Sequence, residues 1–576
     1  MISIGSIRKR VRPLTWEMLF LYSAVLSLSV IASDHIVIDG GEYSTWEVNR
    51  ISPYGYGDLA LFAFVFILCF TIGTLALALL FPTSEAYKGK NPSLEVARLN
   101  RKPILLMSVI LFALYLPYLL AYWPGLIFGD SVSSLSQSLG FSDYSNHHPL
   151  AFTLCVKACL FVAHMLGLSN SAGCALFTII QMVVLSLCFA TTVQWVMQRT
   201  GCRRIWRFVL LAFFGIPPYF ATYTIAMWRD PLFSAAVLML TLLIFDLAAS
   251  KGHVLQTEKA WLPAFALSCL VACLFRSNGI LAAILLAVVL AAMALRSRSA
   301  YKKPAAIGAA TAIAALLLTG PVFTALGVTP AAKAEGVGIP LNQMARVAAT
   351  GGIMSDEDKR YLNELLPLEL YETVYTPTCV DSVKWNPEFN EEALSDGFWR
   401  HWLSMGIENP ITYLESWELQ TVGYWSINQP QVLSHNRNIA AGVPRNSQDP
   451  ASLEAWEIYP QNKLGNDAVH SLLCTDQGFI PIGWLSWFAL SAVIALFNCK
   501  KSAWFVSLVP TAAIIATLLV ASPIWYWERY AVALQFLLPF YVVMLYCTDG
   551  VRRRPVSNKQ RTRLSKLFAS PKTHTI

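Results

Sequence analysis

The sequence predicts an all-α polytopic membrane protein, and three observations support this prediction. Of the 576 residues, 55% are hydrophobic and only 14% are charged, whereas about 25% of residues are charged in a typical soluble domain. Apolar runs long enough to cross a bilayer recur along the chain. Lysine and arginine cluster in alternate loops, as the positive-inside rule requires of a multispanning protein. We therefore expect about 12 transmembrane helices.

The predicted crossings follow directly from the apolar runs. They lie at residues 14–33, 58–81, 104–122, 172–197, 205–226, 231–249, 261–276, 279–295, 304–326, 481–497, 504–521 and 530–547. The first run is long and lacks a small-residue cleavage site, so we expect a retained helix and no cleaved signal. Basic residues precede this run from Arg8 to Arg12 and also fill the tail after residue 548. We therefore expect a plasma-membrane protein with both termini in the cytoplasm.

One further apolar segment, residues 150–167, does not fit this count. If it crossed the membrane, the basic loop at Arg203 and Arg204 would lie outside, against the positive-inside rule. Lys157, in its middle, would also cost roughly 2.5–3.5 kcal/mol at the bilayer centre. We favour a helix at the outer interface, within the first large outer loop, and a full crossing stays the alternative.

Composition divides the chain into five regions. Charged residues, Pro and Asn become common between residues 327 and 480, which indicates an extracytoplasmic domain inserted before the last three helices. Cys379 and Cys474 lie in this domain and could form a disulfide in an oxidising compartment. The regions are 1–103 (two helices and a cytoplasmic loop), 104–326 (a transmembrane core with outer loops), 327–480 (the inserted domain), 481–548 (three helices) and 549–576 (a basic cytoplasmic tail).

The first outer loop carries an unusual polar stretch, YWPGLIFGDSVSSLSQSLGFSDYSNHHP, at residues 122–149. Val132, Leu135 and Leu139 recur at helical spacing, which predicts a short amphipathic helix lying on the bilayer. Asp130 would begin this helix, close to the membrane surface. An aspartate at a helix N-terminus is most often only a cap, so the motif alone does not establish a catalytic role.

Three more polar residues, Asp143, His147 and His148, end the same stretch. The two histidines could bind a metal. No matching cluster accompanies them in the sequence, so hydrogen bonding at the membrane interface is the simpler interpretation.

Three later segments place charged residues on the same predicted face. They are RDPLF with Arg229 and Asp230, FRSNG with Arg276, and WERYA with Arg529. Each has a simple explanation, namely an ion pair between helices or an interfacial aromatic belt. Ionisable residues at membrane depth are nevertheless functional candidates by default. We therefore expect Asp130 and Asp230 to converge with the arginines in one outer pocket.

The net charge of +8 does not require a nucleic-acid partner. Anionic lipid headgroups at the cytoplasmic face are sufficient partners for the basic loops and tail. The sequence also contains no GKS or GKT phosphate loop, GxGxxG or CxxC motif, so a nucleotide-driven pump has no support.

These motifs resemble the GT-C class of membrane glycosyltransferases, in which the first outer loop carries an essential aspartate, an HP motif enters the interfacial helices, and a second acid follows. The matching elements are Asp130 in PGLIFGDS, HHPLAF at 147–152 and Asp230 in RDPLF. Over most of its length the chain is also similar to an uncharacterised bacterial family of multispanning predicted glycosyltransferases, which shares DPLF, RSNG, PLNQMARV and ERY. Asp130 is followed by Ser131, not by the glutamate of several relatives, which leaves a metal requirement open.

The resemblance implies a glycosyltransferase that uses a polyprenyl-phosphate sugar donor. The acceptor would be an outer hydroxyl of a cell-envelope glycan, a lipid or a protein, and the reaction would invert the anomeric centre. Asp130 would act as general base. Asp230 would orient the acceptor or the base, or both acids would hold a divalent cation, Mg or Mn.

The same resemblance suggests roles for the remaining polar residues. Arg276 and Arg529 would bind the donor phosphate, as would Arg229 unless it only pairs with Asp230. His147, His148 and Asp143 would be acceptor-binding or accessory residues. The aromatic motifs at 399–402 and 424–430 could stack on acceptor sugars or form the core of the inserted domain.

Two other function classes use a similar number of helices. A multispanning transporter or lipid-linked glycan flippase is the main alternative, and a surface-glycan polymerase or ligase is another. Against transport, the sequence has no pair of interrupted helices in matching halves. Its polar residues also gather at one predicted face, whereas transporters bind substrates near the midplane.

Overall fold

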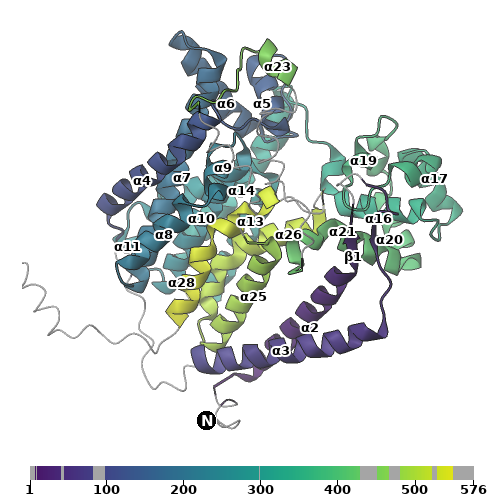
Figure 1. The fold of residues 1–576 in the computed structure, drawn as a ribbon, viewed down its shortest axis with the longest axis horizontal. Helices are drawn as coiled ribbons and strands as arrows, with labels where there is room; N and C mark the ends of the chain where they lie inside the picture. The colour runs from purple at the N-terminus through teal and green to yellow at the C-terminus, as the bar shows by residue number, and fades with distance from the viewer. Residues whose placement is uncertain are drawn as a thin grey trace, which may run out of the picture.

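In the computed structural model, a bundle of long helices is joined to a lobe of shorter helices (Figure 1). The structure describes residues 7, 10–39, 44–81, 96, 98–296, 299–428, 450–465, 480–521, 524 and 528–548. Within these residues the secondary structure is almost entirely helical. The two short strands β1 (Ile36–Ile38) and β2 (Asn49–Ile51) form an antiparallel hairpin that joins the first two long helices.

Eight helical segments of the described chain are long and apolar enough to span a membrane. They are α2 (Pro13–His35), α3 (Tyr56–Leu80), α4 (Arg101–Ala121), α7 (Asn170–Thr200), α10 (Arg229–Ala249), α13 (Ser277–Arg296), the run Ser299–Ala325 formed by η2 (Ser299–Tyr301), α14 (Lys302–Leu317), η3 (Leu318–Val322) and α15 (Phe323–Ala325), and the run Trp504–Ala521 formed by η7 (Ser502–Leu508) and α26 (Val509–Ala521). The pair α8 (Ile205–Gly215) and α9 (Pro218–Ile225), bent by 56°, would make a ninth. The prediction of an all-α polytopic membrane protein is confirmed.

The remaining apolar helices are shorter, at 10–17 residues. They are α6 (Leu150–Met165), α12 (Trp261–Phe275), α25 (Ile482–Asn498) and the run Arg529–Leu545 formed by η8 (Glu528–Ala531), α27 (Val532–Phe536) and α28 (Leu538–Thr548). Each predicted crossing therefore corresponds to a helix, but three of the twelve fall in this shorter class and one is the bent pair. Length alone does not establish the count of twelve.

The outer surface of the bundle is apolar where lipid would lie. On α3, Phe64 is 64% exposed and Ile67 is 63% exposed, and this helix buries little of its surface against the rest of the chain. Large apolar surfaces on a water-soluble monomer are rare because water disfavours them. In a bilayer the same side chains meet lipid tails at no such cost.

A polar layer marks one end of the bundle, which is predicted to be cytoplasmic. There Arg12 Nη1 donates to the carbonyl of Phe497 at 2.7 Å, which ties the start of α2 to the end of α25. The backbone N–H of Asn100 donates to Gln198 Oε1 at 3.1 Å, which ties the start of α4 to the end of α7. The segments whose basic residues predicted a common cytoplasmic side therefore lie together at one end of the helix bundle.

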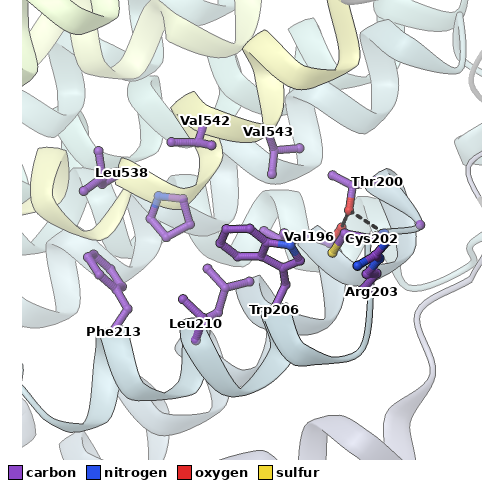
Figure 2. A pocket seen from close by; sticks show the side chains of 13 residues that line it. Val196, Thr200, Cys202, Arg203, Trp206, Leu210, Phe213, Leu538, Val542 and Val543 are labelled. Atoms are coloured by element: carbon purple, nitrogen blue, oxygen red, sulfur yellow. Dashed lines mark hydrogen bonds between the residues drawn. The ribbon is translucent and has the colours of Figure 1, made fainter. Parts of the chain in front are cut away.

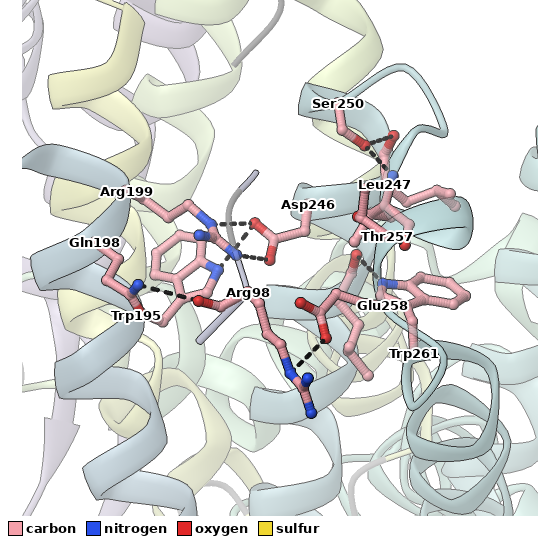
Figure 3. Close-up of polar contacts among 12 residues, drawn as sticks. Arg98, Trp195, Gln198, Arg199, Asp246, Leu247, Ser250, Thr257, Glu258 and Trp261 are labelled. Atoms are coloured by element: carbon pink, nitrogen blue, oxygen red, sulfur yellow. Dashed lines mark hydrogen bonds and ion pairs between the residues drawn. The ribbon is translucent and has the colours of Figure 1, made fainter. Parts of the chain in front are cut away.

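The same end holds a buried ion pair (Figure 3). Arg199 donates from Nε to Asp246 Oδ1 at 2.8 Å and from Nη2 to Oδ2 at 2.6 Å, and Trp195 Nε1 donates to Oδ1 at 3.0 Å. Both carboxylate oxygens of Asp246 are thus satisfied. This acid lies inside an apolar run of the sequence, and the structure gives it a structural role.

Helix α6 lies at the opposite end of the bundle (Figure 1). It begins at Leu150, directly after Pro149, and the next helix, α7, starts at Asn170, whose Nδ2 donates to the carbonyl of Trp456 at 2.8 Å. Lys157 Nζ is hydrogen-bonded to the hydroxyl of Tyr144. With 16 residues, α6 belongs to the shorter apolar helices, and its placement at the outer interface stays a prediction.

The inserted region folds as a lobe of short helices with its own apolar core. Its elements are η4 (Lys333–Gly336), α16 (Gly338–Ala349), α17 (Asp356–Leu365), η5 (Leu368–Leu370), α18 (Tyr371–Val374), α19 (Asp381–Lys384), η6 (Glu391–Ser395) and α20 (Phe398–Glu408). Leu362, Tyr371 and Met405 are fully buried in this core. The following helices α21 (Pro410–Trp425) and α23 (Pro450–Ala455) instead place Leu419 and Leu453 in the main core, so the predicted 327–480 region contributes to two cores.

Candidate active site

Two loops lie at the end of the helix bundle opposite Gln198, and hydrogen bonds between their backbones join them. The N–H of Leu126 donates to the carbonyl of Ile225 at 3.0 Å, and the N–H of Met227 donates to the carbonyl of Leu126 at 2.9 Å. Gly125 has φ of +129°, and a Cβ there would lie 2.9 Å from the Ile225 carbonyl oxygen. The glycine of the PGL motif therefore permits the contact that brings the two predicted acidic segments together.

Asp130 is the second residue of α5 (Gly129–Leu139), the amphipathic helix that the sequence predicted. Ser131 Oγ donates to the carbonyl of Met227 at 2.6 Å, which holds the start of α5 beside the start of α10. A carboxylate at this position also benefits from the positive end of the helix dipole.

Two arginines hold the carboxylate of Asp130. Arg529 Nη1 lies 2.8 Å from Asp130 Oδ2, and Arg229 Nη2 lies 3.3 Å from the same oxygen. Burial alone would raise the pKa of Asp130, but the charges of Arg529 and Arg229 hold it well below its usual range. Asp130 is therefore ionised at neutral pH.

His148 completes this cluster as a neutral imidazole. Burial, followed by the charge of Arg229, lowers the pKa of His148 to about 3. Its Nδ1 accepts from Arg229 Nη1 at 2.8 Å. This pairing assigns the proton to Nε2, which lies 3.9 Å from Asp130 Oδ1.

The second predicted acid, Asp230, pairs with Arg276. Asp230 is fully buried, and its Oδ1 accepts from Arg276 Nη1. Its Oδ2 has no hydrogen-bond partner among the described residues. The guanidinium of Arg276 lies over the ring of Tyr530, 4.7 Å from the centroid, in a cation–π contact.

The glycine of the RSNG motif positions Arg276. A Cβ on Gly279 would lie 1.9 Å from the carbonyl oxygen of Ala272, so no side chain fits. The N–H of Gly279 donates to the carbonyl of Arg276 at 3.0 Å. This close approach makes the turn between α12 and α13 tight enough to present Arg276 toward α10.

A cavity of about 430 Å³ adjoins the two ion pairs. Arg229, Arg276 and Tyr530 line one part of it, and His147 and Glu335 line another. Asp130, Asp230 and Arg529 are not among its lining residues, which are Asn146, His147, Pro149, Arg229, Cys273, Leu274, Arg276, Ser277, Asn278, Ile280, Leu281, Thr319, Ala331, Glu335, Gly336, Thr517, Leu518, Ala521 and Tyr530. The two acids therefore meet one arginine cluster, as expected, but neither acid lines this cavity.

Sequence reasoning missed the contribution of the inserted region to this cavity. Glu335 Oε1 accepts from Lys384 Nζ at 2.7 Å and lies 4.0 Å from His147 Nδ1. Lys384 is buried and also pairs with Asp381 at 2.8 Å. No local motif marks Glu335, because its partners come from distant positions. Tyr530, by contrast, belongs to the ERY motif and could have been selected with Arg529.

Other predicted site residues lie outside this cluster. Asp143 is exposed on the loop between α5 and α6 and does not line the cavity. Cys379 is buried, but Cys474 lies outside the described residues, so the disulfide stays a prediction. The aromatic residues 525–527 also lie outside the described part of the chain.

The acidic residues of the cluster do not fit a divalent cation. Within the described residues, no three His, Cys, Asp or Glu side chains converge in a way that could hold an ion. Asp130 and Asp230 each face arginine guanidinium groups, whose positive charge opposes a second cation. Mg²⁺ or Mn²⁺ therefore has no assigned ligands here, and the chemistry below uses the chain's own residues.

A second, larger cavity of about 700 Å³ lies at the other end of the bundle (Figure 2). Apolar residues of α8 and α28, including Trp206, Leu210 and Val542, form its walls, and Arg203 lies at one end. From Gln181, which bonds the carbonyl of Ala226 beside the first site, to Thr200, α7 rises about 28 Å. No acidic residue lines this cavity, and none of the predicted site residues reaches it.

Comparison with known proteins identifies one family. Residues 142–563 match the DUF6020 family, a family of unknown function, and because this range covers most of the chain, the protein belongs to that family. The matched range contains Arg229, Asp230, Arg276 and Arg529 but begins after Asp130. No curated protein and no solved structure matches the chain.

Proposed function

We propose that this DUF6020 protein is a membrane glycosyltransferase that moves a sugar from a polyprenyl-phosphate donor to an extracytoplasmic hydroxyl with inversion. The single observation that carries the proposal is the 430 Å³ cavity, whose lining joins two partly buried arginines to apolar helix surfaces. The resemblance of the PGLIFGDS, HHPLAF and RDPLF segments to GT-C glycosyltransferases points to the same reaction.

The cavity suits an amphiphile with one anionic group. Ile280 and Leu281 of α13 and Leu518 of α26 give an apolar wall within the bundle. Arg229 and Arg276 give a cationic wall beside it. Guanidinium groups bind phosphate through paired hydrogen bonds, and their charge is worth more in a site that excludes water. A phosphate at the arginines with its lipid chain along the apolar wall would satisfy both surfaces.

The proposed topology places this cavity at the extracytoplasmic side. It has twelve crossings, counting the bent pair and the three shorter apolar helices, with α6 at the interface and both termini in the cytoplasm. The rise of about 28 Å along α7 between the two ends of the bundle is close to the roughly 30 Å of a bilayer's hydrocarbon core. The outer face of the membrane has no ready supply of nucleotide sugars, so a donor carried by a lipid fits a site on that side.

The proposed reaction is a single displacement. The acceptor hydroxyl oxygen attacks the anomeric carbon and forms the new glycosidic bond. The bond between that carbon and the phosphate oxygen breaks, and the lipid phosphate leaves with the electron pair. Asp130, already ionised, takes the proton of the hydroxyl. Arg276 and Arg229 stabilise the charge that develops on the leaving phosphate.

The remaining residues have supporting roles in this proposal. Asp230 holds Arg276 in place, and Arg529 holds Asp130. His147 and Glu335, which also line the cavity, would contact the acceptor. The acceptor would be a cell-envelope glycan, a lipid or a protein that reaches the outer membrane surface.

Cells provide the test of this function. A strain lacking the gene should lose one substituent from an outer glycan, lipid or protein and accumulate the lipid-linked sugar. Wild-type protein and Arg203→Gln, changed at the distant cavity, should restore the product, and Asp130→Asn should not. In vesicles, purified protein should release polyprenyl phosphate only when an acceptor is present. Movement of lipid-linked sugar across the vesicle without release of polyprenyl phosphate would instead indicate a flippase.

A further inference from the structure

Arg229 belongs both to the ion-pair cluster around Asp130 and to the wall of the 430 Å³ cavity. Its guanidinium contacts Asp130 Oδ2 at 3.3 Å and donates to His148 Nδ1 at 2.8 Å. The same residue lines the cavity, whereas Asp130 does not. Arg229 therefore connects the cavity wall to the carboxylate of Asp130, whose own side chain is 20% exposed.

The second partner of Asp130 is held more firmly. Arg529 lies closer, at 2.8 Å, and its side chain is only 5% exposed. Its guanidinium lies 5.1 Å from the ring centroid of Trp228 and 5.0 Å from that of Tyr530. Stacking against two rings fixes the guanidinium in position. Of the two ion pairs, the one with Arg229 is the longer and the one in contact with open space.

A phosphate in the cavity would compete with Asp130 for Arg229. The phosphodiester of a polyprenyl-phosphate sugar carries one negative charge and two free oxygens, which can accept paired hydrogen bonds from a guanidinium as a carboxylate does. The monoester released after transfer carries about −1.5 to −2 charges at neutral pH and three acceptor oxygens. Arg229 begins α10, so its long side chain can turn toward the cavity while the helix stays in place. Arg276 already lines the cavity and would bind the same phosphate.

We infer that Arg229 is an exchangeable partner of Asp130, which a donor phosphate draws away to strengthen the base. This inference rests on the proposed function. Withdrawal of Arg229 leaves Asp130 with one arginine, so less positive charge opposes the uptake of a proton by the carboxylate. The donor must then bind before the acceptor is deprotonated, because without the donor two arginines hold the carboxylate.

Carbodiimide labelling of Asp130 tests this inference without knowledge of the sugar. The full-length protein in lipid nanodiscs is treated with a carbodiimide and an amine trap at constant pH, with and without polyprenyl phosphate. Mass spectrometry then compares the modification of Asp130 with that of exposed Asp143, an internal reference. We expect polyprenyl phosphate to raise the labelling of Asp130 several-fold and to leave Asp143 unchanged.

Two variants sharpen the result. Arg229→Gln should show high labelling of Asp130 without phosphate and no further increase with it. Arg229→Lys keeps the positive charge but loses the planar fork of hydrogen-bond donors, so the labelling of Asp130 should be intermediate. This variant also replaces Arg229→Gln in the test if the glutamine variant does not fold. Arg203→Gln, changed at the distant cavity, should behave as wild type.

A parallel binding measurement separates the two ways in which this account can fail. If polyprenyl phosphate does not bind the wild-type protein by native mass spectrometry, the proposed function is wrong. If it binds, but Asp130 labelling stays unchanged in wild type and low in Arg229→Gln, Arg229 is not an exchangeable partner and only this inference is wrong.

Discussion

The bundle contains two systems of buried arginines and aspartates, one near each end, and they are built differently. At the Gln198 end, Arg199 and Asp246 face each other through two hydrogen bonds, and Trp195 satisfies the same carboxylate. None of these three residues lines either of the two cavities described above. At the other end, Arg229 and Arg276 pair with acids and also line a cavity.

The difference separates a structural ion pair from a binding site. A buried ion pair in which both carboxylate oxygens already accept hydrogen bonds from the protein has no free carboxylate oxygen with which to bind a ligand. In the second system one oxygen of Asp230 has no partner among the described residues, and two guanidinium groups border open space. Groups arranged in this way can exchange a protein partner for an anionic ligand.

The largest expected effect is on catalysis. Asp130→Asn keeps the shape of the side chain but cannot take a proton, so transfer should fall by about 10²–10⁴-fold, the usual contribution of a general base. Product formation in membranes measures this, at matched amounts of folded protein. Asp143→Asn, thirteen residues further along, should transfer at the wild-type rate. Equal rates for both variants would remove Asp130 from the mechanism.

Breaking the structural pair should affect stability instead. Arg199→Ala leaves Asp246 buried without its cation, which should lower the free energy of unfolding by about 3–5 kcal/mol. Denaturant unfolding in detergent micelles measures this loss. The paired change Arg199→Met with Asp246→Leu should recover most of it, because no buried charge remains. Transfer per folded molecule should stay near wild type in both, and a selective loss of transfer would contradict the comparison.

A smaller effect is expected on ligand affinity. Arg276→Lys keeps a positive charge beside Asp230 but loses the planar fork that grips phosphate. Loss of one charge-assisted hydrogen bond should weaken polyprenyl phosphate binding by about 1.5 kcal/mol, or roughly tenfold. Titration into nanodiscs followed by intrinsic tryptophan fluorescence would measure the Kd. The matched change Arg203→Lys in the second cavity should leave the Kd unaltered.

Near neutral pH, the smallest expected effect is a pH dependence of stability. Burial lowers the pKa of His148 from 6.5 to about 3, so unfolding takes up a proton at any pH between these values. His148 therefore lowers stability progressively as the pH falls below about 6.5, by at most about 1.4 kcal/mol per pH unit. Unfolding curves at several pH values should show a shallower acid dependence in His148→Asn than in wild type. A slope that the substitution leaves unchanged would mean that His148 has the same pKa in the folded and the unfolded protein.

Much of this architecture could be predicted from the sequence, because lipid-facing helices need long apolar runs and loop charges report their side. The convergence of Asp130, Arg229 and Arg529 followed from the same topology. The inserted region was harder to predict, because Glu335 reaches the cavity and pairs with Lys384 through contacts between distant residues. That Arg229 lines the cavity and Asp130 does not was also not predictable, since it depends on side-chain directions that periodicity does not encode.

The glycines show how short motifs carried information that sequence reasoning did not use. Gly125 and Gly279 each stand where a Cβ would collide with a backbone carbonyl oxygen. They were noted only as parts of PGL and RSNG. Their function is steric, since each lets one segment approach another closely enough to assemble the arginine cluster.

The most direct test of the central claim is a structure of the protein determined with polyprenyl phosphate in a lipid nanodisc. The account predicts the phosphate between Arg229 and Arg276, beside Tyr530, with the chain along Ile280 and Leu518. A phosphate bound instead at Arg203 in the second cavity, with the first cavity empty, would contradict it.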